Sequence, residues 1–381
     1  MTGTLDAIVI GGGIAGAAAA AGLADRGRRV VLLERETTAG RHSTGRSAAI
    51  LRLAFNAPGD RELGLVTHRL LGDPAASEPY GGPSALRRVG ALNVASGPGA
   101  RGRLEAEAAA LAEAGLDVRV VEVDEAIRLS PPLAGASFTA ALFDAADGVL
   151  DVHALLEGLL RAVRDAGGGG AVRLGRAAVR LVREGDRITG VEVGGETLRA
   201  PLVVNAAGPW ADAIAATAGL APLGLSPCRR HLMVTPPLAG VDPSGPIVWD
   251  VDSVAYYRPE SGGLLFSGCD EDRLDPCDCP TDEDAMAAAM ERVATRFPAL
   301  AEVGVAHAWA GLRTLSPDRR PIVGPDPRAP GLFWCAGLGG HGICASLGLR
   351  RLVGELAASE SPTWIDAPAL SPDRFLEARS R

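Results

Sequence analysis

Three glycines close to the N-terminus have the spacing of a phosphate-binding turn. Gly11, Gly13 and Gly16 follow the pattern G-x-G-x-x-G between an apolar segment and an alanine-rich one. The first glycine allows a tight turn, the second lets a pyrophosphate approach the backbone, and the third lets helix and strand pack closely. A helix that begins near Ile14 offers unpaired N–H groups to phosphates. Glu34 ends the next apolar segment, where a carboxylate suits the hydroxyls of a ribose. The pattern therefore predicts a Rossmann-like strand–helix–strand unit that binds a dinucleotide, in preference to a purely structural turn.

A polar segment after this unit indicates which dinucleotide is bound. Residues 39–49 read AGRHSTGRSAA and are rich in small residues and hydrogen-bond donors. Three later segments complete the pattern: LVVNAAGPWA at 202–211, WAGLR at 309–313 and GLFWCAGLGGHGI at 331–343. Together they resemble the flavoprotein superfamily of D-amino-acid oxidase, glycine oxidase and sarcosine oxidase, and HSTGRSAA is most similar to its D-arginine dehydrogenase branch. The resemblance spans nearly the whole chain and implies FAD as the cofactor.

The resemblance also implies which residues hold FAD. The residues expected to bind it are Gly11, Gly13, Ile14, Ala15, Gly16, Glu34, Arg35, His42, Ser43, Thr44, Arg46, Ser47, Ala48, Val179, Ala207, Gly208, Trp210, Gly337, Gly339, Gly340, His341, Gly342 and Ile343. The start of the final helix is expected to face the flavin N1–C2=O edge with its positive end. Some relatives tether FAD through a histidine, but the D-arginine dehydrogenase branch carries an equivalent HSTGRS without a tether. No cysteine lies between Leu315 and Val323, where sarcosine oxidases attach their flavin. We therefore expect non-covalent FAD.

A flavin that oxidises an amino acid needs a carboxylate anchor and a neutral amine, because an ammonium cannot release hydride. Arginine suits the anchor, since its planar guanidinium matches a carboxylate bidentately. Arg313 stands where this family carries its carboxylate-binding arginine. Arg230 is a second candidate, although the sequence does not tell whether it or the adjacent Arg229 points inward.

Two tyrosines and a histidine are further candidate catalytic residues. Tyr256 and Tyr257 lie on an expected strand and therefore point to opposite faces. One is expected to face the pocket, where the family places a tyrosine hydroxyl on the carboxylate, unless both only pack in a core. His341 lies in the glycine-rich loop, where it either donates to the flavin, helps to deprotonate the substrate amine, or only lines the loop.

These residues predict an FAD-dependent oxidoreductase that moves hydride from the Cα of a D-amino acid or related secondary amine to flavin N5. The imino acid formed would hydrolyse to a 2-oxo acid. The main alternative is an FAD-dependent 2-hydroxy-acid dehydrogenase of the same fold, which needs a true base such as His341 or His231. A non-catalytic nucleotide-binding protein fits the presence of Arg313 poorly. An NAD-only dehydrogenase leaves the HSTGRSAA segment and the C-terminal loop without a ligand. The electron acceptor is either oxygen or a quinone or other electron carrier.

Two departures from the D-arginine dehydrogenase pattern bear on the substrate. Ile50 and Phe55 stand where that branch carries a histidine and a tyrosine that contact substrate, and Arg52 lies between them. The segment 87–95, matched to a loop that supplies an acid for the guanidinium, contains no acidic residue. We therefore expect a substrate other than arginine and a more apolar pocket.

Composition narrows the class of protein. The chain has 381 residues and a net charge of -8, which gives no electrostatic case for nucleic acid or anionic membranes. All 38 basic residues are arginine, so no lysine is present for the oxygen-activating role that it has in sarcosine oxidases. No apolar run is long enough to span a membrane, and the six cysteines show no zinc-ligand spacing. We expect a cytoplasmic protein without a metal site.

The fold class expected is α/β, α+β overall, with the chain alternating between two domains. The FAD-binding domain is predicted to comprise residues 1–50, 149–222 and 318–381, and the substrate-binding domain, of mixed sheet plus helices, residues 51–148 and 223–317. Helices are expected at 101–115, 153–166, 281–296 and 343–359, and a glycine-rich hinge at 167–170. Strands are expected at 177–183, 188–193, 232–235, 254–258 and 263–267.

Overall fold

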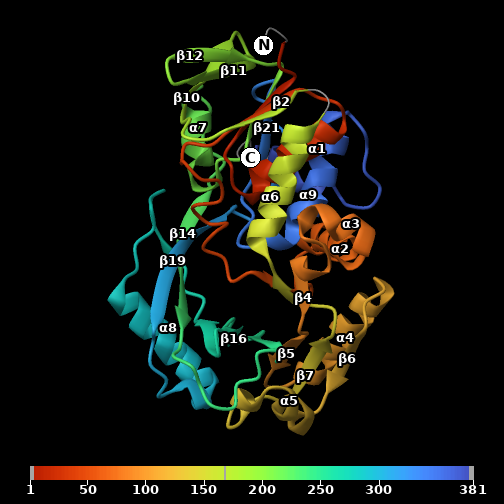
Figure 1. The fold of residues 1–381 in the computed structure, drawn as a ribbon, viewed down its shortest axis with the longest axis vertical. Coiled ribbons are helices and arrows are strands. Elements are labelled where there is room, and N and C mark those ends of the chain that lie inside the picture. Colours follow the sequence, from red (N-terminus) through yellow and green to blue (C-terminus); the bar gives the residue numbers. More distant parts are fainter. Residues whose placement is uncertain (1–3, 167–168, 377–381) are drawn as a thin grey trace.

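The fold is built around two large sheets at opposite ends of the molecule (Figure 1). It is described by a computed structural model that covers residues 4–166 and 169–376. The hinge predicted at 167–170 lies partly outside these residues. The N-terminal segment and the final helix lie at one end, and the segments around residues 90–140 and 250–300 lie at the other.

A six-stranded sheet forms the first end. Its order is β20 (Ile322–Pro325), β21 (Leu332–Ala336), β13 (Leu202–Asn205), β1 (Ala7–Ile10), β2 (Val30–Leu33) and β9 (Ala171–Arg173). All strands are parallel except β20, which pairs antiparallel with β21. The central strands are short apolar runs buried on both faces, as is typical of a parallel sheet covered on both sides. Ala7 and Val9 face one core and Ile8 and Ile10 the other.

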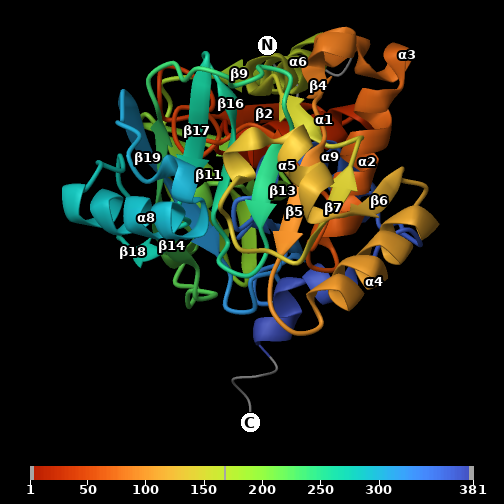
Figure 2. The same ribbon diagram turned by 90° about the horizontal axis from the view of Figure 1, so that it is seen from below.

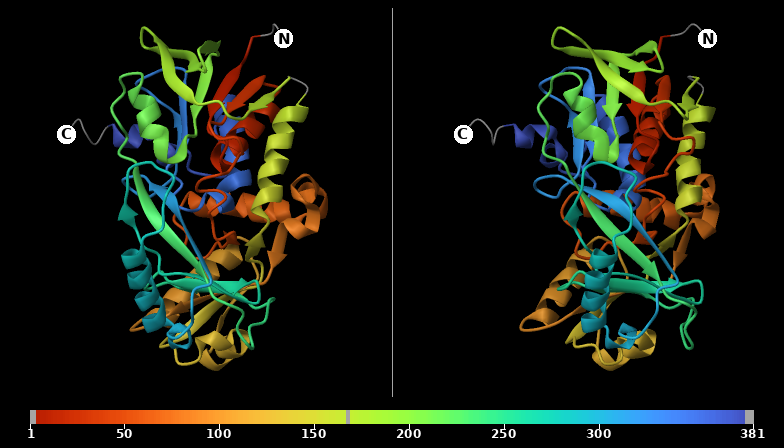
Figure 3. Two further views of the ribbon diagram at one scale, coloured as in Figure 1. Left: turned by 60° about the vertical axis from the view of Figure 1, so that its left-hand side comes forward. Right: turned by 90° about the vertical axis from the view of Figure 1, so that its left-hand side faces the viewer.

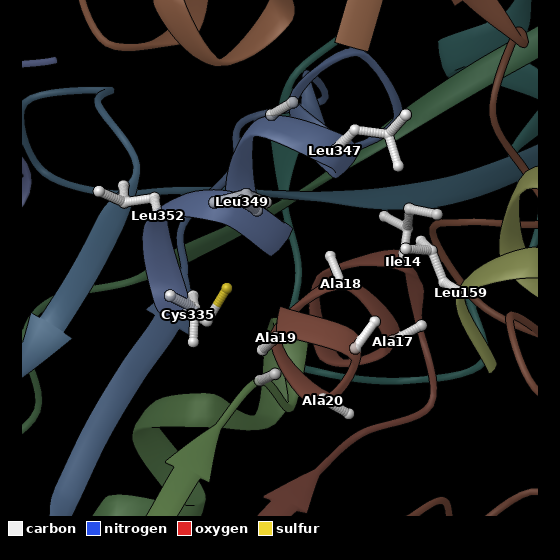
Figure 4. Close-up of a cluster of buried hydrophobic side chains, with 14 of the residues drawn as sticks. Ile14, Ala17, Ala18, Ala19, Ala20, Leu159, Cys335, Leu347, Leu349 and Leu352 are labelled. Atoms are coloured by element: carbon white, nitrogen blue, oxygen red, sulfur yellow. The ribbon is translucent and has the colours of Figure 1, made fainter. Parts of the chain in front are cut away.

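Helices cover one face of this sheet. They are α1 (Ile14–Asp25), α2 (Asp60–Gly72), α6 (Val152–Asp165) and α9 (Gly342–Ala357). Figure 4 shows the alanines of α1 beside Leu347, Leu349 and Leu352 of α9 and Cys335 of β21. Small residues allow this approach, because a methyl group at Gly22 would lie 2.0 Å from the carbonyl oxygen of Arg350. The alanine-rich sequence after the glycine turn is therefore the surface that lets α1 and α9 pack closely.

The other face carries a small sheet and one helix. The sheet consists of β10 (Ala178–Glu184), β11 (Arg187–Val193) and β12 (Glu196–Arg199), and the helix is α7 (Ala211–Ala216). A further three-stranded sheet of β3 (Ile50–Leu51), β8 (Gly148–Leu150) and β4 (Leu86–Arg88) lies where the chain passes between the two ends, near α3 (Pro74–Ser77).

A nine-stranded mixed sheet forms the second end. Its strands are, in order, β18 (Asp272–Arg273), β14 (Ser226–Val234), β17 (Gly263–Ser267), β16 (Tyr256–Glu260), β15 (Ile247–Asp250), β5 (Ala91–Ala95), β7 (Ala140–Asp144) and β6 (Val118–Val121), with β19 (His307–Leu315) on β14. Its helices are α4 (Ala100–Glu113), α5 (Val123–Leu129) and α8 (Glu283–Arg296), and Figure 2 shows α4 and α8 on opposite sides of this end. The long pair β14–β19 extends from this end toward the first sheet (Figure 3).

The predicted fold class is confirmed: helices and sheets combine in a mixed α/β protein with a Rossmann-like unit at its N-terminus. The four helices predicted from the sequence correspond to α4, α6, α8 and α9 within two residues at either end. The domain boundaries stay a prediction. The interpretation of residues 87–95 as a loop is wrong, because most of this segment forms β4 and β5. Leu92 and Val94 direct their side chains into the core of the nine-stranded sheet, which holds the segment as a strand.

Two kinds of functional feature, a membrane-spanning helix and a metal-binding cluster, are absent from the described residues. In the part of the chain that the structure describes, no helix is both long and apolar enough to cross a membrane. Within the same residues, no cluster of three or more histidine, cysteine, aspartate or glutamate side chains is arranged to hold a metal ion.

Candidate active site

A cleft with a volume of about 470 Å³ lies at the carboxyl ends of the parallel strands. Ligands of open α/β sheets bind at this edge. The cleft extends from the end of β2 to the ends of β14 and β19. Its wall contains Gly11, Gly13, Ile14, Ala15, Glu34, Arg35, His42, Ser43, Thr44, Arg46, Ser47, Ala207, Gly208, Trp210, Arg230, Arg313, Gly337, Gly339, Gly340, Gly342 and Ile343.

The glycine turn opens the start of α1 to the cleft. Gly11 has φ +106°, and a methyl group there would lie 2.4 Å from the carbonyl oxygen of Ala206. A methyl group at Gly16 would lie 1.9 Å from the carbonyl oxygen of Gly11, so this glycine holds helix against strand. No side chain caps α1 at Gly13, and the hydroxyl of Thr44 accepts the N–H of Ile14 at 3.0 Å. The other N–H groups of the first turn therefore remain available to a phosphate.

An acidic residue and an aromatic cluster lie at the far end of the cleft. The carboxylate of Glu34 accepts the N–H groups of Gly12 at 2.6 Å and of Glu36 at 2.8 Å. Its side chain is thereby fixed at the end of β2, where a ribose would lie. Trp210 packs against both Arg35, whose guanidinium carbon is 3.9 Å from its ring centre, and His42, whose ring centre is 4.8 Å away.

The polar segment after β2 is fastened to β19. The Ser43 hydroxyl donates to the carbonyl of Leu312 at 2.6 Å, and Arg46 donates to the carbonyl of Ala310 at 3.1 Å. A methyl group at Gly311 would lie 3.0 Å from Cβ of Arg46, so a glycine permits this contact. The segment thus forms a wall that connects the nucleotide end of the cleft to Arg313.

These residues fit an FAD. Gly11 and Gly13 expose their backbone to the cleft at the start of α1, and a larger side chain at either position would occupy the space for the pyrophosphate. Three of the expected residues lie off the wall: Gly16 packs on Gly11, Ala48 joins an apolar cluster of the second sheet, and His341 turns toward α2. The side chain of Val179, on β10, lies outside the described residues.

Sequence reasoning missed several wall residues. They are Ile10, Leu33, Gly40, Arg41, Arg176, Ala177, Ala178, Ala206, Pro209, Ala213, Ile214, Thr217, Gly311, Leu312, Thr314, Cys335, Ala336 and Leu338. Many of them follow directly on a predicted strand end or flank a predicted residue, so extending each strand by its next residues finds them. The wall residues on α7 could not be predicted, because small and apolar residues there are typical of any helix packed on a sheet.

Arg313 lies at the inner end of the cleft, on β19. Its guanidinium packs against the backbone of Gly340, where a methyl group would lie 1.9 Å from Nη1. No hydrogen bond or ion pair joins it to any residue within 4–166 and 169–376. Burial lowers the pKa of Arg313, and the positive charge of Arg230 adds to this effect. A partly buried guanidinium without an anion is costly and is well placed to take a carboxylate.

Arg230 also faces the cleft, whereas Arg229 faces away. Arg230 donates from Nε to the carbonyl of Asp270 at 2.7 Å and from Nη2 to Glu271 at 3.0 Å. Arg229 instead pairs with Asp272 and Asp282. The structure therefore answers which of the two adjacent arginines points inward, and it gives Arg230 protein partners that Arg313 lacks.

The two tyrosines point to opposite faces of the nine-stranded sheet, as predicted from alternation. Tyr257 lies in the core of that sheet, edge-on to Phe297, and its hydroxyl is 2.9 Å from the Ser130 hydroxyl. A direct role for Tyr257 in substrate binding is therefore not supported. Tyr256 lies on the face of Arg313 and Arg230, whose charges act against the burial that raises its pKa. Its hydroxyl is buried near Ser267, but no described residue lies within hydrogen-bonding geometry of it.

His341 and Asp60 form a pair beside the cleft. Nδ1 of His341 is 3.7 Å from Oδ2 of Asp60 at the start of α2, and the Asp60 side chain is 3% exposed. Burial lowers the pKa of His341 to about 3, and Arg52 and Arg313 contribute to this decrease. Burial raises the pKa of Asp60 to about 7, with a contribution from Glu62. The histidine is therefore neutral at physiological pH but a weak base, while Asp60 titrates near neutrality and is the stronger base of the pair.

His231 is not available as a base. Its side chain is fully buried, its Nδ1 is 2.7 Å from Oδ2 of Asp270, and its Nε2 accepts the N–H of Asp282 at 3.0 Å. Both ring nitrogens are therefore used within the protein, and of the two histidines considered as a base only His341 remains.

Comparisons with known proteins agree with this geometry. Residues 6–356 match the model of a family described as FAD dependent oxidoreductase, DAO. D-amino acid dehydrogenase 2 of Ralstonia nicotianae is 29% identical over 435 residues, which cover 94% of this chain and 98% of that protein. Among solved structures, L-proline dehydrogenase from P. horikoshii superposes with a TM-score of 0.87 at 22% identity and covers 99% of both chains. Glycine oxidase from Geobacillus kaustophilus gives 0.79 at 24%, covering 97% of this chain and 98% of that one. At these identities the structural likeness shows the fold.

Proposed function

The chain belongs to the DAO family of FAD-dependent oxidoreductases, and from this premise we propose that it oxidises the Cα–N bond of a D-amino acid or related secondary amine. Bound FAD supplies the hydride acceptor at its N5 position. The product is an imino acid, which hydrolyses in water to a 2-oxo acid and an amine. The observation that carries this proposal is the partly buried guanidinium of Arg313 at the inner end of the cleft, which has no hydrogen-bond or ion-pair partner among the described residues.

The protein would contribute mainly position and charge. Arg313 holds the substrate carboxylate bidentately, and Arg230, which keeps its own partners, adds positive charge to the same place. Fixing one end of the substrate in this way orients its Cα–H and lowers the entropic part of the barrier. The hydroxyl of Tyr256, which has no full hydrogen bond of its own, is a further donor for the carboxylate.

The amine must be neutral when it reacts, and the pair of His341 and Asp60 is suited to take its proton. With a pKa lowered to about 3, His341 is uncharged at neutral pH and is itself too weak a base to keep the proton of an ammonium. Its imidazole would instead pass the proton to the carboxylate of Asp60, whose pKa is raised to about 7 and whose Oδ2 lies 3.7 Å from Nδ1 of His341.

The relatives and structural neighbours bear on the chirality of the substrate. A D-amino acid dehydrogenase is among the sequence relatives, which supports the D-form. The names of the structural neighbours include an L-proline dehydrogenase and L-amino acid deaminases, so the fold accepts both hands. The electron acceptor we propose is oxygen or a quinone or other electron carrier, and the FAD we propose to be non-covalent.

The pair of His341 and Asp60 also keeps a second function open. A 2-hydroxy-acid dehydrogenase removes a hydroxyl proton as the hydride leaves, which needs a base within reach of the substrate. The same pair would supply this base, with the imidazole of His341 passing the hydroxyl proton to the carboxylate of Asp60 as the hydride leaves.

The experiment that tests the proposal is product analysis of the FAD-loaded protein with an artificial electron acceptor. Amino acids of both hands, N-methyl amino acids and 2-hydroxy acids are offered separately. Equal amounts of 2-oxo acid and ammonia or methylamine support amine oxidation. A 2-oxo acid formed only from hydroxy acids would transfer the function to the alternative.

A further inference from the structure

We propose that the substrate carries a large apolar side chain, aromatic or branched aliphatic, which binds on one face of the nine-stranded sheet. The inference rests on the proposed function, since it takes Arg313 as the carboxylate anchor. It concerns what lies next to that anchor.

The register of the long strand pair places the anchor and an apolar surface on the same face. Residues directly opposite each other in an antiparallel pair point the same way. Leu232 lies opposite Trp309, and Arg230 lies opposite Gly311. Since alternate residues share a face, Trp309 and Arg313 project from β19 on the side of the sheet that Arg230 and Leu232 occupy on β14.

The same face continues across the neighbouring strands. Trp249 is paired with Tyr256, and Val234 with Leu265. These side chains form an apolar cluster separate from the main cores, in which Ala48, Leu232, Tyr256 and Leu265 are buried. Its partly exposed members are Ile50, Val234, Trp249, Cys269 and Trp309. We call these five residues the apolar wall. A partly exposed apolar cluster beside an unpaired guanidinium fits an amphipathic ligand.

Two indole rings of the apolar wall are held in fixed positions. Trp249 stacks on Tyr256 with ring centres 4.5 Å apart and planes 8° apart, and it also lies 4.2 Å from the guanidinium carbon of Arg52. The indole N–H of Trp309 donates to the backbone carbonyl of Arg46 at 3.3 Å. Rings fixed before binding lose little conformational freedom when a ligand packs on them.

The spacing of anchor and wall sets the size of the side chain. Arg46 packs over Gly311, between Trp309 and Arg313 on the strand. The part of the wall next to the anchor is therefore Cys269 and Trp249, which stacks on Tyr256. A glycine anchored at Arg313 has no side chain to place there. A phenyl or isobutyl group attached to the substrate Cα covers the exposed part of Cys269 and Trp249.

Arg52 is the feature that favours an acidic side chain instead, but its guanidinium is already engaged. Its Nη1 donates to the carbonyl of Ala54 at 2.5 Å and to Oδ1 of Asn93 at 2.9 Å. Asp147 supplies a nearby negative charge. An acidic substrate is therefore an outcome of the test and not the expectation.

The test is calorimetric titration of the FAD-loaded protein with carboxylates that lack an amine and cannot be oxidised. Acetate, succinate, 4-methylpentanoate and 3-phenylpropanoate serve as probes. We expect the last two to bind at least about tenfold more tightly than acetate or succinate, since one well-packed apolar group is worth about 10- to 200-fold. Equal affinities, or tightest binding of succinate, would overturn the inference.

Variants assign the preference to the apolar wall. Trp249→Ala is expected to weaken 3-phenylpropanoate about tenfold or more and acetate less than threefold. Cys269→Ser, which replaces the thiol by a polar hydroxyl, gives a smaller loss in the same direction if Trp249→Ala fails to fold. Trp364→Ala is the matched control, because this indole is bonded to Glu355 on α9, away from the wall. A loss of the same size in Trp364→Ala, or none in the first two, would refute the inference.

These results separate the two proposals. If apolar carboxylates bind preferentially but no amine is oxidised, the proposed function fails and the apolar preference stands. If amines are oxidised without any preference for apolar carboxylates, only the inference about the side chain fails.

Discussion

Replacement of Arg313 by glutamine tests the carboxylate anchor most sharply. In the substrate complex this change truncates one partner of a buried, hydrogen-bonded charge pair, which costs about 2–5 kcal/mol. At 1.36 kcal/mol per tenfold, kcat/KM should fall about 30- to 5,000-fold. The substrate-free protein should behave in the opposite way, because Arg313 has no ion pair among the described residues and the partial burial of its charge is unfavourable. Its thermal unfolding temperature should therefore stay the same or rise.

Arg296→Gln is the control for the predicted direction of the stability change. Arg296 pairs with Asp250, whose side chain is fully buried. Removing this partner leaves a buried carboxylate uncompensated and should lower the free energy of unfolding by about 3–5 kcal/mol. The assays are steady-state kinetics with an artificial acceptor and thermal unfolding of the FAD-loaded proteins. The reasoning is refuted if Arg313→Gln keeps kcat/KM within about threefold, or if it destabilises the substrate-free protein as Arg296→Gln does.

Three further predictions concern the cofactor site and the acid–base pair. Gly16→Ala should lower both the FAD content and the unfolding temperature, because the added methyl would lie 1.9 Å from the carbonyl oxygen of Gly11. The control Gly102→Ala adds a methyl in open space on α4 and should be neutral or stabilise the protein by about 0.5–1 kcal/mol. FAD-to-protein absorbance ratios and melting curves check this pair, and equal FAD loss in both would contradict it. The raised pKa of Asp60, about 7, means that its ionised form destabilises the folded protein. The free energy of unfolding of Asp60→Asn should therefore equal that of the unmodified protein near pH 4. Toward pH 8 it should become progressively larger, by up to about 4 kcal/mol. Chemical denaturation at several pH values measures this difference, which must grow with pH. Finally, acid precipitation should release all flavin into the supernatant for the natural chain and for His42→Ala alike; flavin retained on the natural chain alone would reveal a tether at His42.

The parts of the fold that could be predicted from the sequence depend on local pattern. The glycine turn, the apolar runs on either side of it and Glu34 specify the N-terminal unit, because each residue type has one physical reason to be there. The helices could be predicted from periodicity and from their ends. The strand at 91–95 was missed, because it lies between two neighbouring strands and its nearly continuous apolar sequence ALNVA shows no clear alternation.

The candidate site divides in the same way. Most cleft residues could be predicted, because strand ends and glycine loops mark them in the sequence. The choice between Arg229 and Arg230 could not, since it depends on the register of β14 against β19. The pair of His341 and Asp60 was missed as well, because nearly three hundred positions separate them and no local pattern connects α2 to the last glycine loop. Contacts of this kind are set by tertiary packing.

The central claim is that this flavoprotein oxidises an amine beside a carboxylate held by Arg313. The most direct measurement is the visible spectrum of the FAD-loaded protein mixed anaerobically with two substrates that differ only at the reacting heteroatom, phenylalanine of either hand and the corresponding phenyllactate. The account predicts loss of the oxidised flavin absorbance with the amino acid and none with the hydroxy acid, and a much slower loss with the amino acid in Arg313→Gln. Reduction by phenyllactate alone would contradict it.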